Sequence, residues 1–353
     1  MRVLIVCDWF LKHAVGQTAA LARAGAHVSL LCRSHNLEFG GSSTERQELL
    51  AELNGIPIRT LDGRVRSVSR SGQIVQLRRS IRHWRPDVVH AQDNADPGLL
   101  GIVRGLPRAV TIHDPVPHPG HPALGRLEAV VRRRWISGSS LIVVHGESLV
   151  DELPTWVRRA NVAVLPLGVP VAERPLPTPA RPTVLLFGRL QRYKGVSVLL
   201  EAMSLVWNSR PDVLLRIAGE GPEAARVPAD ERIDLRSGYV PEADVESLLA
   251  ETTVAVLPYV QASQSGVGSL ALSYGIPAIV SDVGSLRELA VDETYVVRPG
   301  DPEALARAIL AHVDDDNSSR NAALEFARRR LSWDACAPRL LDLYADRVVG
   351  RAA

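Results

Sequence analysis

TVLLFGRLQRYKGVSVLLEAMSLVW, residues 183–207, contains an apolar run, a short basic loop and a second apolar segment. A continuous apolar run of this length predicts a strand that is buried on both faces. The apolar residues after Gly195 recur at helical spacing, so we predict a helix from there to Trp207. A strand, a tight loop and a helix in this order form the repeating unit of a doubly wound α/β domain, which binds ligands at the carboxyl ends of its strands.

The same alternation continues on both sides of this unit. After it, the sequence predicts strands within 213–221, 233–240, 253–259, 277–282 and 294–301, and helices at 242–251, 266–274 and 302–313. Before it, the sequence predicts strands within 2–7, 27–33, 87–92, 108–114, 141–148 and 161–169, and helices at 13–26, 73–86 and 98–106. An amphipathic helix is predicted at 332–349. Alternating strands and helices of this kind predict parallel sheets covered by helices.

A proline-rich segment separates the two series. Residues 170–182 contain five prolines and few apolar side chains, which predicts an interdomain linker. The length of 353 residues also suits about two domains. Two such domains in tandem are expected to leave a cleft between them.

Composition narrows the class of protein. Hydrophobic residues make up 46% of the chain, which is ample for two cores. No apolar run reaches the roughly 18–20 residues that span a bilayer, and the first strand is too short for a signal peptide, so we expect a cytoplasmic protein. The 3 cysteines follow no metal or redox spacing, which predicts buried free thiols. Residues 1–170 carry 21 basic and 14 acidic side chains, which favours either an anionic partner or a solvated basic surface.

The loop after the strand 183–187 contains Gly188, Arg189 and Lys194. Two cations beside the free N–H groups of a helix start predict a diphosphate site. Other strand ends of the same half supply Glu220, Tyr239 and Val240. Backbone groups at 239–240 are candidates to pair with a nucleobase edge.

Candidate residues of the first half also follow strands. His113 comes directly after a strand in TIHDPVPHPGHP, residues 111–122. Three histidines occur in this segment, but their spacing on an extended, proline-rich chain matches no zinc site, so we expect no metal. The candidate acceptor-side residues are Lys12, His13, Asp93, Asn94 and His118.

A long neutral stretch runs from Thr252 to Ser281, without a single charged residue. Within it, VQASQSGVGSLALSYG (260–275) passes from small polar residues into a helical apolar pattern. A helix N-terminus with serine and glycine around it offers neutral donors to an anion. The donors expected here are Ser263, Gln264, Ser265 and the backbone N–H groups of Gly266 and Val267.

In combination, GRLQRYKG, IAGEGP, SGYVPEADV, SQSG…YGIPAIVSDVGSLRE and TIHD resemble a glycosyltransferase of the GT-B fold, in the large retaining family 4. The motifs cover nearly the whole chain in order, including a terminal SWD…LLDLY helix that in such enzymes crosses back to the first domain. The resemblance implies an α/β protein with two Rossmann-like doubly wound domains facing a cleft. Residues 1–171 plus 333–353 would form the acceptor-side domain, and 172–332 the donor-binding domain.

The resemblance also implies a metal-independent transfer of a sugar from a nucleotide-diphosphate sugar to an acceptor, without a cofactor. Arg189 and Lys194 would hold the diphosphate and neutralise the departing charge. His113 would contact the donor sugar near its reacting carbon, which completes the candidate catalytic set. Gly16, in the first strand–helix loop, would lie near the phosphates or the acceptor. The expected donor-binding residues are Gly16, Gly188, Glu220, Tyr239, Val240, Ser263, Gln264, Ser265, Gly266, Val267 and Glu288.

The neutral stretch departs from the family pattern, which usually has two glutamates eight positions apart. Ala262 and Leu270 occupy those positions. SQSG is expected to replace the first acid, and Glu288 to substitute in part. The leucine at position 270 leaves three alternatives. Other residues hold the ribose, the nucleotide contains deoxyribose, or the protein has lost its activity. The alternative function is therefore a catalytically lapsed nucleotide-sugar-binding or partner subunit. A nucleotide-sugar 2-epimerase, a third reading, would need acids and bases that this loop lacks.

Two basic stretches, 78–85 and 131–137, combine arginine with tryptophan. Similar enzymes often act on lipid-linked acceptors and touch the inner membrane face through such helices. The other interpretation is a solvated basic face with one buried tryptophan. No motif supports nucleic-acid binding.

Overall fold

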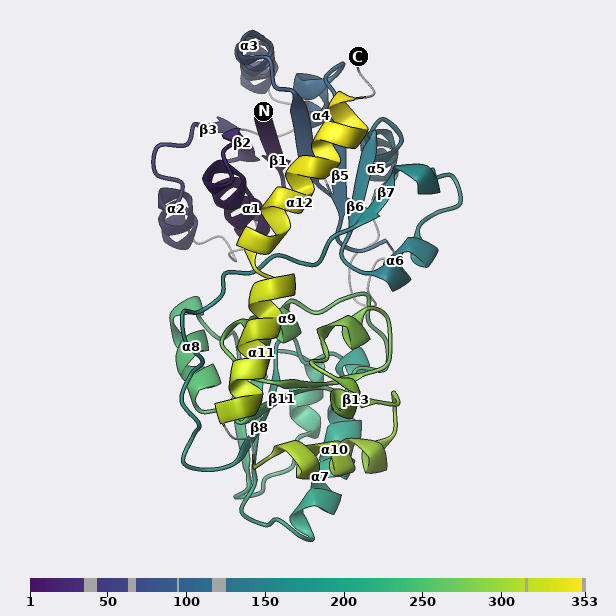
Figure 1. The fold of residues 1–353 in the computed structure, drawn as a ribbon. Coiled ribbons are helices and arrows are strands. Elements are labelled where there is room, and N and C mark those ends of the chain that lie inside the picture. The colour runs from purple at the N-terminus through teal and green to yellow at the C-terminus, as the bar shows by residue number, and fades with distance from the viewer. Residues whose placement is uncertain (35–42, 63–67, 94, 116–124, 315–316, 351–353) are drawn as a thin grey trace. The chain divides into compact units, whose positions relative to one another are not determined.

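The computed structural model describes residues 1–34, 43–62, 68–93, 95–115, 125–314 and 317–350 (Figure 1). The chain divides into two compact units. Unit 1 comprises Met1–Gly168 and Trp333–Ala353, and unit 2 comprises Val169–Ser332. The first junction thus follows Gly168, whereas the sequence places it after residue 171.

Unit 1 is built on a 7-stranded parallel sheet with the order β3-β2-β1-β4-β5-β6-β7. The order reverses between β1 and β4, which is the switch point where doubly wound sheets bind ligands. Its strands are β1 (Arg2–Cys7), β2 (His27–Arg33), β3 (Ile58–Leu61), β4 (Val88–Gln92), β5 (Arg108–Ile112), β6 (Leu141–Val144) and β7 (Val162–Val164).

Helices enclose this sheet on both faces (Figure 1). Along β1, Val3 and Ile5 belong to one apolar cluster while Leu4 and Val6 belong to another, so alternate side chains enter separate cores. This two-sided burial explains why residues 3–7 of the strand are all apolar. The helices are α1 (Leu11–Arg23), α2 (Ser43–Ala51), α3 (Val68–Trp84), α4 (Pro97–Val103), α5 (Arg126–Ser137), α6 (Glu147–Glu152) and α12 (Trp333–Tyr344).

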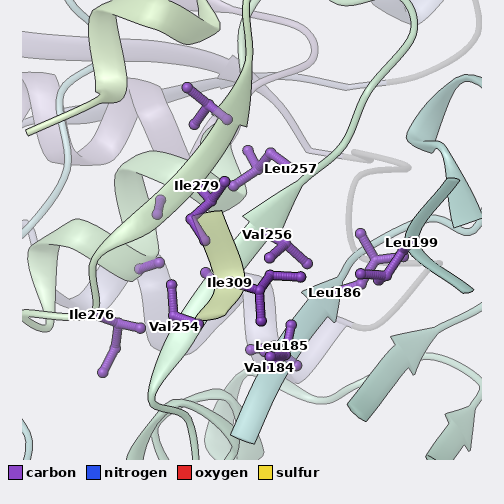
Figure 2. Packing of buried hydrophobic residues seen from close by; sticks show 14 of the residues in the cluster. Val184, Leu185, Leu186, Leu199, Val254, Val256, Leu257, Ile276, Ile279 and Ile309 are labelled. Atoms are coloured by element: carbon purple, nitrogen blue, oxygen red, sulfur yellow. The ribbon is translucent and has the colours of Figure 1, made fainter. Parts of the chain in front are cut away.

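Unit 2 contains a 6-stranded parallel sheet with the order β10-β9-β8-β11-β12-β13. Figure 2 shows how Val184, Leu186 and Val256 from neighbouring strands meet Leu199 and Ile309 from the helices. Its strands are β8 (Thr183–Phe187), β9 (Leu214–Gly219), β10 (Ile233–Ser237), β11 (Val254–Leu257), β12 (Ala278–Ser281) and β13 (Val296–Val297). Its helices are α7 (Val196–Trp207), α8 (Glu242–Ala250), α9 (Gly266–Ser273), α10 (Pro302–His312) and α11 (Asn317–Arg330).

The proline-rich segment 170–182 is attached to unit 2 and is not a free tether. The backbone N–H of Ala172 donates to the Ser273 carbonyl at 2.9 Å, and that of Leu176 donates to the Tyr274 carbonyl at 3.0 Å. The guanidinium of the buried Arg320 donates to the Leu176 carbonyl at 3.2 Å. These bonds fix the segment along the end of α9. The proline-rich composition correctly indicated an irregular chain, but it did not indicate that the chain is anchored to unit 2.

Other expectations concern burial. Cys7, Cys32 and Cys336 are free and buried, as predicted. Trp135 of the basic stretch 131–137 is fully buried in the unit 1 core, so this ring is not available to a lipid surface. Among the described residues, no helix has the length and apolar character needed to cross a bilayer.

Helix α12 returns to unit 1 and packs its first residue against two glycines. An added Cβ at Gly16 would lie 2.7 Å from Cε2 of Trp333, and one at Gly168 would lie 2.7 Å from Cδ2 of the same ring. Real Cβ atoms do not approach other atoms this closely. Glycine at both positions is therefore required by the indole and not by a loop conformation.

Gly16→Ala is expected to lower the free energy of unfolding by about 1–3 kcal/mol, because the new methyl group overpacks the contact with Trp333. Gly72→Ala is the matched control, since Gly72 is an exposed position of α3 with no atom within 4 Å of a new Cβ. Alanine there should stabilise the helix by about 0.5–1 kcal/mol. Urea unfolding of both variants checks the pair, and equal effects would contradict the packing account.

Candidate functional site

The predicted donor residues of unit 2 gather at one edge of its sheet. All pairs of neighbouring strands in this sheet are parallel, so the loops after β8, β9, β10, β11 and β12 leave the same edge. The loop after β8 meets the loop after β11 where the Val260 N–H donates to the Tyr193 carbonyl at 2.9 Å. The Ser285 N–H likewise donates to the Ser263 carbonyl at 3.0 Å.

Two glycines allow these loops to approach one another. Gly195 has φ of 72° and lies against the Pro258 carbonyl group, where an added Cβ would collide with the backbone. Gly219 has φ of 138°, and a Cβ there would collide with the Gly188 carbonyl. Only glycine combines a positive φ with this close backbone contact. The predicted Gly188 lies at this junction, and a Cβ on it would be 3.3 Å from Cγ2 of Val267.

Lys194 is buried beneath this edge. Its Nζ donates a hydrogen bond to the Tyr259 hydroxyl at 2.6 Å, and that hydroxyl lies 3.3 Å from Oγ of Ser265. The Tyr259 hydroxyl therefore links Lys194 to Ser265, the N-cap residue of α9. Sequence analysis missed Tyr259, although an aromatic hydroxyl directly after a buried strand and a proline was a usable signal.

Burial also makes the Lys194 ammonium easier to deprotonate, because it lowers the pKa of this group. Removal from water disfavours the ammonium and lowers the pKa of Lys194 to about 8, and repulsion from Arg189 acts in the same direction. Arg189 itself is exposed. A shared anion would relieve the repulsion between these two cations, so the pair is suited to a phosphate group.

The Ser/Gly turn presents a capped helix N-terminus. Ser265 is the N-cap of α9, and its side chain accepts from the Gly268 N–H at 3.3 Å. The next residues, Gly266 and Val267, begin the helix as predicted. Oε1 of Gln264 is buried and has no hydrogen-bond partner among the described residues. Buried polar atoms are normally paired, so this acceptor is suited to a ligand donor.

The remaining donor candidates surround this turn. Glu220 and Tyr239 are exposed, Tyr239 at 61%, while Val240 packs against the unit 2 core. The Gly238 N–H donates to the Gly219 carbonyl at 3.1 Å, which places the turn before Tyr239 beside the turn of Glu220. Glu288 lies in the helical turn Leu286–Leu289 that follows Ser285. Leu270, on α9, packs against the core, so its side chain contributes an apolar contact.

His113 is buried in unit 1, and each of its ring nitrogens lies near a polar side chain. Its Nε2 lies 2.9 Å from Oε1 of Gln92, and its Nδ1 lies 3.2 Å from Nε2 of His145. Phe10 stacks on the ring with the centroids 3.8 Å apart. A direct bond from His113 to a sugar hydroxyl would therefore require the exchange of one of these partners. His145, which sequence analysis did not select, follows β6 as His113 follows β5.

The residues expected in the first strand–helix loop are in fact helical. Because Phe10 adopts a left-handed conformation with φ of 60°, the chain turns sharply and α1 begins at Leu11. Lys12 and His13 therefore lie in the first turn of α1, and Gly16 lies within the helix against Trp333. The helix predicted at 13–26 is thus confirmed for His13 and Gly16, whereas the additional placement of Lys12, His13 and Gly16 in the preceding loop was wrong.

Asp93 forms a double ion pair with Arg132. Nε of Arg132 donates to Oδ1 of Asp93 at 2.6 Å, and Nη2 donates to Oδ2 at 3.0 Å. Burial raises the pKa of Asp93, while the Arg132 charge opposes that shift. The carboxylate is thus already engaged within unit 1. Asn94 and His118 lie outside the described residues.

Comparison with known proteins assigns the fold to a family. The model of the glycosyl transferase 4-like domain matches residues 12–168, and that of glycosyl transferases group 1 matches residues 181–315. The chain belongs to the GT-B glycosyltransferase family of group 1/4 type. Anabaena HepE in complex with UDP has the same fold, with a TM-score of 0.69 and 15% identity over 98% of this chain and 100% of that one.

Relatives of this GT-B family member are more similar in sequence. Glycogen synthase of Mycobacterium tuberculosis is 29% identical over 274 residues, which cover 72% of this chain and 66% of that enzyme, just under two thirds of its length. The GDP-mannose-dependent alpha-(1-6)-phosphatidylinositol dimannoside mannosyltransferase of the same species is 23% identical over 97% of this chain and 95% of that protein. The group 1 match includes every donor-side loop described above.

Proposed function

We propose that this protein transfers a sugar from a nucleoside diphosphate sugar to an acceptor, with retention at the anomeric carbon and without a metal at the diphosphate. The observation that carries the proposal is the meeting of two cations, Arg189 and Lys194, with the Ser265-capped start of α9 at one sheet edge. Cations and free N–H groups together bind phosphate and stabilise the charge that develops on a leaving diphosphate.

The Ser/Gly turn carries no charged residue, which agrees with a site where another loop supplies the positive charge. The positive charge comes from the loop after β8, and the turn supplies neutral donors at a helix N-terminus. Gln264 and Ser263 offer polar atoms to sugar hydroxyls without adding charge. Glu288 and Tyr239 are proposed to complete the donor site, at the sugar and the base respectively.

The named relatives support a nucleotide-sugar donor. One is GDP-mannose-dependent, and HepE was crystallised with UDP. The acceptor is proposed to be a glycan, a lipid-linked molecule or a small anionic molecule. The excess of basic residues in 1–170, 21 against 14 acidic, favours an anionic acceptor.

Donor turnover tests the proposal. Purified protein is mixed with UDP-, GDP-, dTDP- and ADP-sugars and a panel of acceptors, in buffer with chelator, and the free nucleoside diphosphate is measured. Turnover of one donor in chelator, with the α-anomer formed from an α-linked donor, supports the proposal. Turnover that needs added magnesium or inverts the anomer would contradict its metal-independent, retaining part.

A second candidate is a subunit that binds the donor without turning it over. It is favoured by Ala262 and Leu270 in place of the two family glutamates. Calorimetry separates the two functions, because the lapsed subunit binds a nucleotide sugar but releases no nucleoside diphosphate with any acceptor.

Activity is expected to decline at high pH. A lysine whose pKa is lowered to about 8 carries its charge below that pH and loses it as the pH rises through that value. The kcat/KM for donor should therefore fall about tenfold per pH unit above pH 8, whereas kcat falls later because a bound diphosphate favours the ammonium.

Lys194→Arg supplies the control, because a guanidinium stays charged throughout this range. Its kcat/KM should lose the alkaline decline, at a lower maximum because the hydrogen bond to Tyr259 changes. An unchanged decline in this variant would assign the titration to another group.

A further inference from the structure

Three histidines converge at the carboxyl edge of the unit 1 sheet. His13 belongs to the first turn of α1, His113 follows β5 and His145 follows β6. One ring nitrogen of each lies within 4.8 Å of the corresponding nitrogens of the other two. The ring centroids are 4.7 Å apart for His113 and His145, and 4.9 Å apart for His13 and His113.

Hydrogen bonds fix the proton on His145. Its Nδ1 lies 3.0 Å from the Leu165 carbonyl oxygen, which can only accept. Nδ1 therefore carries the hydrogen and donates it to Leu165. In the neutral ring, Nε2 is then a lone pair, and it faces His113.

The proton on His113 is fixed in the same way. The Gln92 amide nitrogen donates to Oε1 of Gln17, so Oε1 is the atom that Gln92 turns toward His113. An amide oxygen can only accept, so Nε2 of His113 carries the hydrogen. Nδ1 of His113 is then also a lone pair, and it lies 3.2 Å from Nε2 of His145.

Two lone pairs that face one another at 3.2 Å repel, and a cation between them would relieve that repulsion. A metal ion supplies that charge without any change of tautomer, because it binds the lone pairs of neutral imidazoles.

We propose that His13, His113 and His145 form a binding site for a divalent cation of the zinc class. Two nitrogens bound to one tetrahedral zinc at about 2.0–2.1 Å lie about 3.3 Å apart, close to the separation of the His113–His145 pair. His13 offers the third nitrogen, which lies within 4.8 Å of the other two. Three histidines leave a fourth position for a water or another oxygen ligand.

The hydrogen-bond partners of these histidines resemble those of histidines in known metal sites. Histidine ligands usually donate their other N–H to a carbonyl or a polar side chain, and His145 and His113 do so to Leu165 and Gln92. Phe10, which stacks on His113, is held at a φ of 60° that is costly for an aromatic residue. Strain of this kind persists where surrounding contacts fix a functional group.

Sequence spacing could not reveal this site. The histidine neighbours of His113 in the sequence, His118 and His121, lie outside the described residues, and the partners proposed here come from other elements. All three ligands belong to unit 1, whereas Arg189 and Lys194 belong to unit 2. The proposal is therefore independent of how the donor diphosphate is bound.

Metal titration of the chelator-stripped protein, with no histidine tag, tests the site. We expect one equivalent of Zn²⁺ per chain, a rise in Tm with Zn²⁺, and a visible absorption band of tetrahedral Co²⁺ that Zn²⁺ abolishes. His145→Ala and His13→Ala should each weaken Co²⁺ binding by about 100-fold or more, since loss of a ligand exceeds the 10–100-fold effect of an outer-shell partner.

His83→Gln is the matched control, because His83 is an exposed histidine of α3 and should bind metal as the wild type does. Absence of stoichiometric metal in the wild-type protein would overturn the proposal, and so would equal affinity in the His145 and His83 variants. The wild-type Co²⁺ spectrum decides the matter even if a ligand variant fails to fold. None of these measurements uses a nucleotide, so their outcome does not depend on whether the protein turns over a donor.

Discussion

Alanine in place of Arg189 or Lys194 is expected to lower kcat/KM for donor turnover by about 10²–10³-fold. Each change removes one positive charge from the point where the leaving diphosphate gains negative charge. The Lys194 variant should show the larger effect, because its Nζ is buried and fixed at 2.6 Å from the Tyr259 hydroxyl. A buried charge is less screened by water than the exposed guanidinium of Arg189.

Steady-state kinetics with the donor identified by turnover measures this effect. Arg192→Ala is the matched control, since Arg192 is an exposed arginine of the same loop and should leave kcat/KM within about twofold. Similar losses in all three variants would point to a general electrostatic effect of the loop. Normal turnover in the Arg189 and Lys194 variants would contradict the phosphate assignment.

Asp96→Ala is expected to lower the free energy of unfolding of unit 1 by about 3–5 kcal/mol. Arg70 and Asp96 are 2% and 1% exposed, and Nη2 of Arg70 donates to both carboxylate oxygens at 2.6 and 2.5 Å. The same carboxylate caps α4 by accepting from the N–H groups of Gly98 and Leu99 at 2.7 and 3.0 Å. Alanine leaves a buried guanidinium without its charge partner and removes the cap.

Urea unfolding followed by tryptophan fluorescence measures this loss, because five of the 6 tryptophans belong to unit 1. Glu325→Gln is the control, since it breaks the exposed Glu325–Arg329 pair and should leave the curve unchanged. An equally small effect at Asp96 would contradict the account of the buried pair.

Much of the fold follows from local sequence. The apolar runs within β1 and β8 favour buried parallel strands, and the structure has these strands at the expected residues. Gly195 and Ser265 mark where α7 and α9 begin, because a left-handed glycine and an N-cap serine are signals within a few residues.

Elements that depend on distant partners escaped prediction. Helix α11 buries Arg320 with three small or apolar residues, so its sequence shows no strong apolar face. The Arg320 guanidinium donates to the carbonyls of Leu176 and Thr252, which are remote in the sequence. The early start of α1 likewise depends on the unusual conformation of Phe10, which no residue pattern indicates.

The residues of the candidate site likewise include some that the sequence predicted and some that it did not. Residues that follow strands, such as Arg189, Lys194 and Tyr239, were predictable because parallel strands bring their ends to one edge. Tyr259 and His145 were not selected, because their importance lies in contacts with Lys194 and His113 from other loops. Sequence order identifies the edge of a sheet, but only the folded chain identifies which side chains meet there.

Nucleotide binding to unit 2 tests the central claim most directly. Thermal-shift titrations with UDP, GDP, dTDP and ADP are compared between the wild type and an Arg189→Ala/Lys194→Ala double variant. The account predicts that at least one nucleotide stabilises the wild type by about 2.7 kcal/mol at about 100 times its Kd, and that the double variant loses most of this effect. No stabilisation by any of the four, or equal stabilisation of both proteins, would contradict it.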